Sequence, residues 1–223
     1  MMSKKILVLV AHSDDEALGC GGTIAKHIRS GDHVKLIFMT NGVGSRENSS
    51  SLEIEERNSS LKKSCEILGV KDYVQLNFED NKMDMYPLLD IIKEVSSVLK
   101  GYDPELIYTH HSSDLNVDHR ITHDVCFTIF RPQPFCSVVE IRTFEVPSST
   151  HWNTGSSFTP NLFVDIKEVK ELKMKSLKCY DEEIREFPHA RSYRGIESLI
   201  VFRGSTVGLE AAEAFCIERK IER

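Results

Sequence analysis

A chain of 223 residues, 40% of them hydrophobic, has enough apolar side chains for one α/β core and is marginal for two. We therefore expect a single domain over residues 1–223. The formal net charge is −6 and the Lys and Arg residues are scattered, which argues against a nucleic-acid groove or an anionic membrane surface and favours a small-molecule partner.

The sequence indicates neither a membrane span nor an oxidising compartment. The basic start of the chain resembles that of a signal peptide, but the apolar run after it is short and ends at His12. No segment approaches the roughly 20 apolar residues of a membrane helix. The six cysteines form no CxxC pair and no dense framework, which fits reduced thiols. We therefore expect a cytoplasmic protein, either a monomer or a homo-oligomer.

Strands and helices alternate over the first 130 residues. The apolar run at 6–11 predicts a strand buried on both faces, and the glycines at 19–22 predict a turn before a helix at 23–29. Later strands are expected at 33–40, 73–76 and 106–109, and amphipathic helices at 51–68, 87–100 and 118–130. This alternation predicts an α/β fold around a mostly parallel sheet with right-handed crossovers.

The last third of the sequence is less regular. We expect strands at 140–146 and 161–165, helices at 166–180 and 195–203, and a short strand or helix at 209–217. No repeat, low-complexity tract or linker divides the chain, which agrees with a single domain.

Polar residues directly follow the first predicted strand. His12 and Asp15 are three residues apart on a tight turn, so their side chains can converge on one cation. Zinc accepts imidazole and carboxylate ligands, and a catalytic zinc takes three protein ligands and leaves one position open. Asp14 points elsewhere and is free to act as a base. The alternative is that Asp14 or Asp15 only caps the following helix.

A second polar cluster, at 114–120, follows the fourth predicted strand. It places His119 at the start of a helix. The two clusters meet if their strands adjoin in the sheet, and His119 is then the natural third ligand. Asp118 can hydrogen-bond a ligand imidazole, as metal sites usually require, or it can cap the helix.

These motifs resemble those of the PIG-L/LmbE-like family of zinc-dependent N-acetylglucosaminyl deacetylases. The resemblance extends over essentially the whole chain. It rests on AHSDDE at 11–16, LGCGGT at 18–23, DLNVDHR at 114–120 and AEAF at 212–215.

The resemblance implies a Rossmann-like three-layer fold and the removal of an acetyl group from an N-acetylglucosamine-type substrate. It also implies that His12, Asp15 and His119 hold zinc. Asp14 matches the general base of the family.

Two positions depart from the family pattern. The first motif usually carries Pro where this chain has Ser13, which should change the rigidity of the turn and not its chemistry. Many members have His at the position of Asn116, as an acid or as a donor to the oxyanion. Asn cannot supply a proton, so we expect His189 to approach the oxyanion, with His110 or His111 as the alternatives. Asn116 can still donate a hydrogen bond.

Three further residues are candidates for substrate contact. Arg46 resembles the arginine with which the family grips its substrate, and the alternative is an ordinary surface arginine. Asp80 and Arg191 lie on loops expected at the same edge of the sheet. There they can contact sugar hydroxyls and an anionic group, or remain solvated or salt-bridged. Two arginines near the site favour an N-acetylated hexosamine that carries an anionic or glycosidic second part.

The sequence therefore predicts a zinc-dependent hydrolase that releases acetate from an N-acetylated amino sugar, with Asp14 taking a proton from the attacking water. Two alternatives stay open. The same fold and metal can act on a non-sugar amide or ester, because neither fixes the substrate. A nucleotide-binding module is the other alternative, although the glycines at 19–22 lack the GxGxxG spacing and follow two acids.

Overall fold

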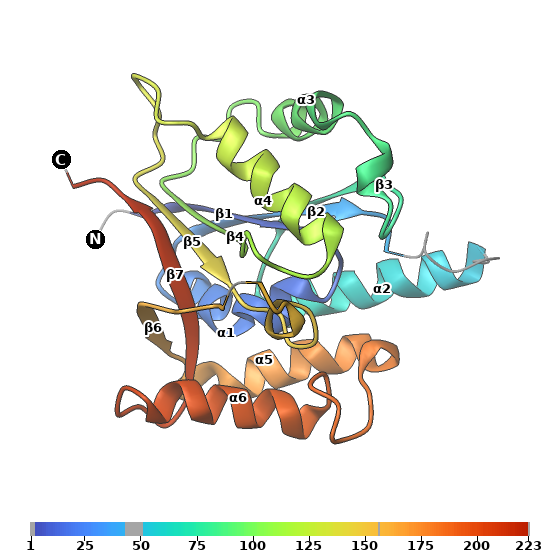
Figure 1. Cartoon of the computed structure of the whole chain (residues 1–223), viewed down its shortest axis with the longest axis vertical. Coiled ribbons are helices and arrows are strands. Elements are labelled where there is room, and N and C mark those ends of the chain that lie inside the picture. The colour runs from blue at the N-terminus through green and yellow to red at the C-terminus, as the bar shows by residue number, and fades with distance from the viewer. Residues whose placement is uncertain (1–2, 43–50, 156, 223) are drawn as a thin grey trace.

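A seven-stranded sheet in the order β3-β2-β1-β4-β5-β7-β6 runs through the middle of the molecule (Figure 1). The computed structural model describes residues 3–42, 51–155 and 157–222. The strands are β1 (Lys5–Val10), β2 (His33–Thr40), β3 (Asp72–Phe78), β4 (Leu106–His110), β5 (Glu140–Phe144), β6 (Leu162–Asp165) and β7 (Ala212–Lys220). The pairs from β3 to β5 are parallel, whereas β7 runs antiparallel to β5 and β6. The predicted mostly parallel α/β sheet is confirmed.

Helices cover both faces of the sheet and complete three layers (Figure 1). They are α1 (Asp15–Arg29), α2 (Ser51–Leu68), α3 (Leu88–Val98), α4 (Val117–Ile129), α5 (Lys170–Leu177) and α6 (Tyr193–Ser205). Short 3₁₀ segments occur at Met83–Met85, Thr150–Trp152, Lys167–Val169 and Lys178–Glu183. Helices α3 and α4 pack on one face and α1 and α2 on the other, with α5 against α1 and α2.

The two halves of the core meet across β1. Val8 and Val10 pack with residues of α1 and α2, and Leu7 and Leu9 pack with residues of α3 and α4. Side chains alternate between the two faces of a strand, so a strand that is apolar at each of these positions must be covered on both sides. The buried first strand predicted from the sequence is therefore confirmed.

The start of α1 differs from the prediction. The helix begins at Asp15, and the glycines expected in a turn are helical, although the helix breaks at Cys20. A Cβ atom on Gly19 would lie 2.2 Å from Phe144 Cδ2, so this glycine allows close packing of the helix on the sheet. These glycines are buried inside a helix, which is incompatible with the alternative of a phosphate-binding loop.

Other boundaries differ because tertiary pairing outweighs local pattern. The segment expected at 209–217 as a strand or helix is the strand β7, which pairs on both sides. Strand β3 extends beyond the predicted 73–76, and the helix expected at 166–180 is α5 flanked by two 3₁₀ turns.

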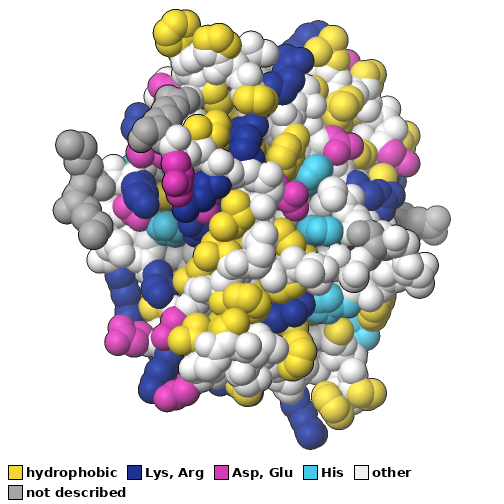
Figure 2. All heavy atoms as spheres, turned by 60° about the vertical axis from the view of Figure 1, so that its left-hand side comes forward, with side chains coloured by type: hydrophobic (Ala, Val, Ile, Leu, Met, Phe, Trp, Pro, Cys, Tyr) yellow, Lys and Arg dark blue, Asp and Glu magenta, His cyan; other side chains and the backbone are white. Residues whose placement is uncertain are grey.

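The surface agrees with the scattered charge of the sequence. On the face shown in Figure 2, Lys and Arg side chains are mixed with Asp and Glu side chains. Within the described ranges, no helix is long and apolar enough to cross a bilayer.

Candidate active site and metal centre

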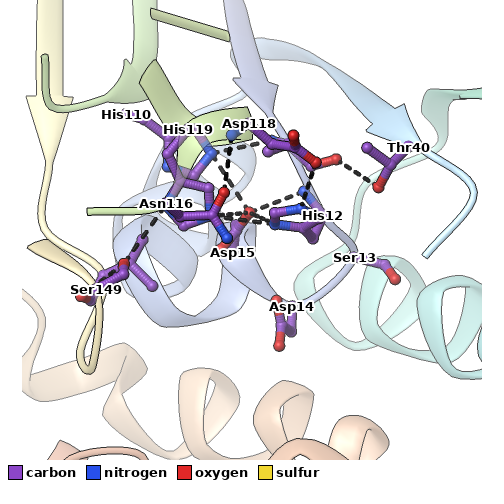
Figure 3. A network of polar contacts seen from close by, with 12 residues as sticks. His12, Ser13, Asp14, Asp15, Thr40, His110, Asn116, Asp118, His119 and Ser149 are labelled. Atoms are coloured by element: carbon purple, nitrogen blue, oxygen red, sulfur yellow. Dashed lines mark hydrogen bonds and ion pairs between the residues drawn. The ribbon is translucent and has the colours of Figure 1, made fainter. Parts of the chain in front are cut away.

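Two neighbouring strand ends bring the predicted metal ligands together (Figure 3). Strand β1 pairs with β4, so the turn after β1 and the loop after β4 lie at the same edge of the sheet. His12 Nδ1 lies 3.1 Å from His119 Nε2, and Asp15 Oδ2 lies 3.2 and 3.3 Å from these two nitrogens. All three side chains are buried. The structure therefore gathers His12, Asp15 and His119 into one cluster.

The donor atoms of this cluster fit a divalent metal ion. Their separations of 3.1, 3.2 and 3.3 Å are close to the roughly 3.3–3.4 Å between ligands of a tetrahedral ion with bonds of about 2.0–2.1 Å. Asp15 Oδ1 is buried and has no hydrogen-bond partner among the described residues. Burial raises the pKa of Asp15, but His119 and His110 outweigh it and hold that pKa well below its usual value. The cluster thus offers one carboxylate and two imidazoles.

Carboxylates hold the other ring nitrogens of both histidines. His12 Nε2 lies 3.1 Å from Asp118 Oδ2 and 3.0 Å from Asp80 Oδ1, and His119 Nδ1 lies 3.1 Å from Asp114 Oδ1. If these outer nitrogens donate, the inner nitrogens His12 Nδ1 and His119 Nε2 keep lone pairs for a metal. His12, Asp80 and Asp118 also lie close enough together to hold a metal ion. The same distances let the two carboxylates accept a hydrogen bond from His12 Nε2.

Asp118 is not the helix cap. The cap of α4 is Asn116, whose side-chain oxygen accepts from Asp118 N at 2.8 Å. The Asp118 carboxylate is fully buried and accepts from Asn81 N at 2.7 Å and Met83 N at 3.1 Å, beside its contact with His12. The interpretation of Asp118 as a helix cap is therefore wrong. Its interpretation as a hydrogen-bond partner of a histidine agrees with the structure.

Asp14 stands apart from the three clustered donors and lines the adjoining cavity. It occupies the N-cap position of α1 without a side-chain cap hydrogen bond, and its φ is 126°. Its Oδ2 lies 3.3 Å from Arg191 Nη1 and 3.7 Å from Arg57 Nη2. Burial raises the pKa of Asp14 to about 6, and the charges of the two arginines oppose that rise. The raised pKa suits a group that takes up a proton.

Glu16 and Arg57 hold the backbone of the turn that contains Ser13 and Asp14. Glu16 accepts a hydrogen bond from Asp14 N at 3.0 Å, and it is itself bound by Ser64 Oγ at 2.7 Å. Arg57 of α2 donates from Nε to Ser13 Oγ at 2.7 Å and from Nη2 to the Ser13 carbonyl oxygen. Both atoms of Ser13 that can accept are thus held by one guanidinium group.

A polar cavity of about 230 Å³ opens beside the cluster. Among the described residues its lining contains one glycine and otherwise only polar or charged side chains: His12, Asp14, Gly42, Arg57, Asp80, Asn81, Asn116, Glu183, Arg185 and Arg191. The predicted residues Asp80, Asn116 and Arg191 are all on this wall. Arg191 does not face the cavity alone, because it pairs with Asp14 and donates from Nε to Ser148 Oγ at 2.7 Å.

Other predicted residues are placed differently or not described. Arg46 lies outside the described residues. His189 is absent from the described cavity lining; its Nδ1 accepts from Arg191 N at 3.0 Å and its ring meets Trp152 edge-on. His110 is buried, its Nε2 accepts from Ala11 N at 2.9 Å, and burial lowers its pKa to about 4.

Comparison with known proteins shows the family to which the chain belongs. Residues 7–130 match the family model described as PIG-L: GlcNAc-PI de-N-acetylase. The chain belongs to the PIG-L family. The uncharacterized deacetylase YaiS of Escherichia coli is 30% identical over 170 residues, which cover 74% of this chain and 83% of the relative. The diacetylchitobiose deacetylase of Thermococcus kodakarensis is 29% identical over 204 residues, or 82% of this chain and 71% of the relative.

Solved structures share the PIG-L fold of this chain. The N,N′-diacetylchitobiose deacetylase of Pyrococcus horikoshii superimposes with a TM-score of 0.78 and 24% identity over 97% of this chain and 84% of its own. GalB, the 4-carboxy-2-hydroxymuconate hydratase of Pseudomonas putida, has a TM-score of 0.77 and 19% identity over 99% of both chains. One fold thus carries a deacetylase and a hydratase.

Three residues at or beside the site of this PIG-L chain were missed in the sequence. Asp114, the buried partner of His119, lies in the second motif, and its alternation with Asn116 and Asp118 was a signal that it faces the site. Arg57 and Arg185 lie in strongly charged segments, where one arginine cannot be told from the next. Only the fold brings them to the cavity.

Proposed function

We propose that this chain is a zinc-dependent hydrolase that removes the acetyl group from an N-acetylated amino sugar. The observation that carries the proposal is that the donor atoms of His12, Asp15 and His119 have the separations of tetrahedral metal ligands and lie beside a polar cavity. Membership of a de-N-acetylase family and deacetylases among the relatives support the reaction class.

His12, Asp15 and His119 would hold the ion. A bound zinc ion acts as a Lewis acid that polarises an amide carbonyl and makes water a better nucleophile at neutral pH. The outer carboxylates Asp114 and Asp118 keep both imidazoles in the tautomer that presents a lone pair inward.

Asp14 takes the proton of the attacking water and passes it to the departing amine. It lines the cavity, and its pKa of about 6 lets it exist in both protonation states near neutrality. The amide C–N bond breaks, the water oxygen stays with the acetyl group, and the amine leaves together with acetic acid, which releases the second proton of the water to the solvent as it ionises to acetate. Arg191 and Arg57 orient the Asp14 carboxylate through its Oδ2 atom.

Asn116 and His189 are the proposed donors toward the developing oxyanion. One N–H of Asn116 Nδ2 is committed to Asn81 Oδ1 at 2.9 Å, so only the other is left for a substrate. Because Nδ1 of His189 accepts from Arg191 N, a neutral His189 carries its proton on Nε2. Reaching the oxyanion would require His189 to approach the cavity when the substrate binds.

The substrate carries an anionic or glycosidic second part. Among the described residues, three arginines line the cavity, but Arg57 pairs with Glu183 at 3.2 Å and Arg191 with Asp14. Arg185 donates from Nη1 to the Glu182 carbonyl oxygen and is the guanidinium best placed to receive an anion. Arg46 stays a second candidate. Asp80, by its place on the wall, is a candidate for contact with sugar hydroxyls.

A metal-dependent hydrolase of a non-sugar amide or ester is the alternative. It is favoured by one observation, the hydratase among proteins of this fold, because fold alone does not fix the substrate.

Metal analysis of the purified chain and a screen for acetate release from N-acetyl sugars, free and anionic, test the proposal. We expect one zinc per chain and turnover that is highest on an anionic conjugate. Arg185→Ala should lower kcat/KM on that conjugate and leave free N-acetylglucosamine unaffected. A metal-loaded chain that hydrolyses simple esters or non-sugar amides but no N-acetyl sugar would overturn the sugar assignment.

A further inference from the structure

A break divides α1 into two helical segments directly behind the metal-ligand turn. Cys20 has φ −147° and ψ 22°, outside the helical region, only five residues after the start of the helix at Asp15. Such a break leaves carbonyl groups on one side and N–H groups on the other without partners in the helix. Residues 15–25 are buried, so water cannot satisfy these groups cheaply.

The Lys173 side chain of α5 satisfies the carbonyl side of the break. Its Nζ atom donates to Ala17 O and Leu18 O, each at 2.8 Å, and to Glu213 Oε1 at 2.6 Å. The ammonium group has three hydrogens, so this set uses all of them. Lys173 is 1% exposed, and a lysine so buried is rare unless it is paired.

The Glu213 carboxylate of β7 satisfies the N–H side. Its Oε1 accepts from Gly22 N at 2.9 Å, and its Oε2 accepts from Thr23 N at 2.7 Å and Thr23 Oγ1 at 2.6 Å. A cation and an anion from two elements distant in sequence thus replace the helical hydrogen bonds that the break removes.

We propose that Lys173 and Glu213 are positioning residues for the metal-ligand turn, an inference that rests on the metal site proposed above. About one and a half helical turns separate the break at Cys20 from Asp14 and Asp15. Leu18 N donates to Asp14 O at 2.9 Å, and the carbonyl of the same Leu18 is held by Lys173. A displacement at Lys173 is therefore passed through one turn of helix to the ligand and the base.

The proposed role of Lys173 and Glu213 depends on their charge and hydrogen bonds and not on the volume that their side chains fill. A methionine at 173 would fill a similar volume but could donate to neither carbonyl, whereas an arginine could donate to both. Lys173→Met and Lys173→Arg therefore separate the hydrogen bonds from the packing. Ile91→Ala is a matched control, because Ile91 is fully buried on α3, on the other face of the sheet.

Zinc Kd, measured by competition with a chromophoric chelator, is the first readout, and kcat and KM are the second. In Lys173→Met we expect zinc binding to weaken by about 10- to 100-fold, the usual effect of losing a group that positions a ligand. We expect kcat to fall as well, with KM within about twofold of wild type. Lys173→Arg should restore both values. Ile91→Ala should lower the melting temperature and leave the zinc Kd unchanged.

Amide hydrogen exchange gives a readout on the wild type alone. Gly22 N and Thr23 N, held by Glu213, should exchange only through global unfolding. Fast local exchange at both amides would contradict the proposal, and so would a folded Lys173→Met protein with wild-type zinc Kd and kcat. If Lys173→Met does not fold, the double variant Lys173→Met/Glu213→Gln, which removes both charges, is judged by the same zinc Kd and kcat. If the double variant does not fold either, amide exchange at Gly22 and Thr23 in the wild type decides.

The failure of this inference differs from the failure of the proposed function. A wild type that binds no zinc and releases no acetate overturns the proposed function. Exchange at residues 14–18 then still tests the positioning, because Lys173→Met should raise it above wild type and Ile91→Ala should not. Equal exchange in Lys173→Met and wild type would overturn the inference.

Discussion

The hydrogen bond between Asp114 and His119 allows a graded test of the metal centre. Asp114 Oδ1 lies 3.1 Å from His119 Nδ1 and accepts from Asn116 N at 2.9 Å. Its Oδ2 accepts from two hydroxyls, Thr150 Oγ1 at 2.6 Å and Ser149 Oγ at 3.0 Å. In Asp114→Asn the oxygen can stay on His119 while the NH₂ group faces the hydroxyls, which accept as well as donate. Asp114→Ala leaves Nδ1 without its acceptor.

We therefore expect two losses of zinc affinity of different size. Removing a carboxylate behind a ligand imidazole weakens metal binding by about 10- to 100-fold, which corresponds to about 1.4–2.7 kcal/mol. Asp114→Ala should fall near the upper end of this range, because His119 loses both its orientation and its preferred tautomer. Asp114→Asn should fall near the lower end, because only the charge is lost. Competition with a chromophoric chelator measures Kd, and near-UV circular dichroism checks the fold.

Asp124 provides a matched control on the same helix. Its Oδ1 lies 3.1 Å from His123 Nδ1, so it forms a similar Asp–His pair, but it is exposed and absent from the described cavity lining. Asp124→Ala should leave the zinc Kd at the wild-type value. A folded Asp114→Ala protein with wild-type affinity would refute the role of Asp114.

Asp14→Asn should keep its zinc and lose about 10²- to 10⁴-fold in kcat, because an amide cannot take up the proton; loss of zinc, or near-normal turnover, contradicts the role of base. Chelation should lower the melting temperature, and zinc at 100 times its Kd should restore about 2.7 kcal/mol, or roughly 5–10 °C, in thermal scans. Burial raises the pKa of Glu145, but hydrogen bonds with His151 and Arg203 outweigh it and hold that pKa below its usual value. A lowered folded-state pKa gives stability that is complete above the unfolded pKa of about 4.3 and is lost as the pH falls. Wild type should therefore be more stable than Glu145→Gln by about 1–3 kcal/mol at pH 7 in urea titrations, and this difference should shrink from about pH 5 to pH 3. A difference that stays constant over this range would contradict the lowered pKa of Glu145.

The convergence of His12, Asp15 and His119 was predictable because these residues are local to two strand ends. His12 and Asp15 share one turn, and His119 lies just after a strand that alternation places in the same parallel sheet. The carboxyl edge of such a sheet gathers loops regardless of the details of packing. The only condition that the sequence left open was adjacency of the two strands, and the pairing of β1 with β4 meets it.

The break in α1 was not predictable from local pattern. Glycines after a strand ordinarily indicate a turn, and nothing local shows that Gly19 is there to admit the Phe144 ring. Arg57 likewise lies in a helix where charged residues are common, and its contact with Ser13 depends on how α2 packs beside the turn. Contacts between distant elements have no period and no motif, so sequence patterns cannot locate them.

The turn that carries Asp14, the proposed base, needs such contacts because its backbone is strained. A φ of 126° is unfavourable for a residue with a Cβ atom, and it persists only where the surroundings over-determine the backbone. At Asp14 the surroundings hold both polar atoms of the preceding peptide group, through Glu16 on the N–H of Asp14 and Arg57 on the carbonyl of Ser13. In the proposed function the motif supplies the reacting groups, whereas Glu16 and Arg57 hold the backbone in the conformation that places Asp14 at the cavity and Asp15 beside the histidines. A protein that kept His12, Asp14 and Asp15 and lost these supports should lose zinc affinity and turnover before it lost its fold.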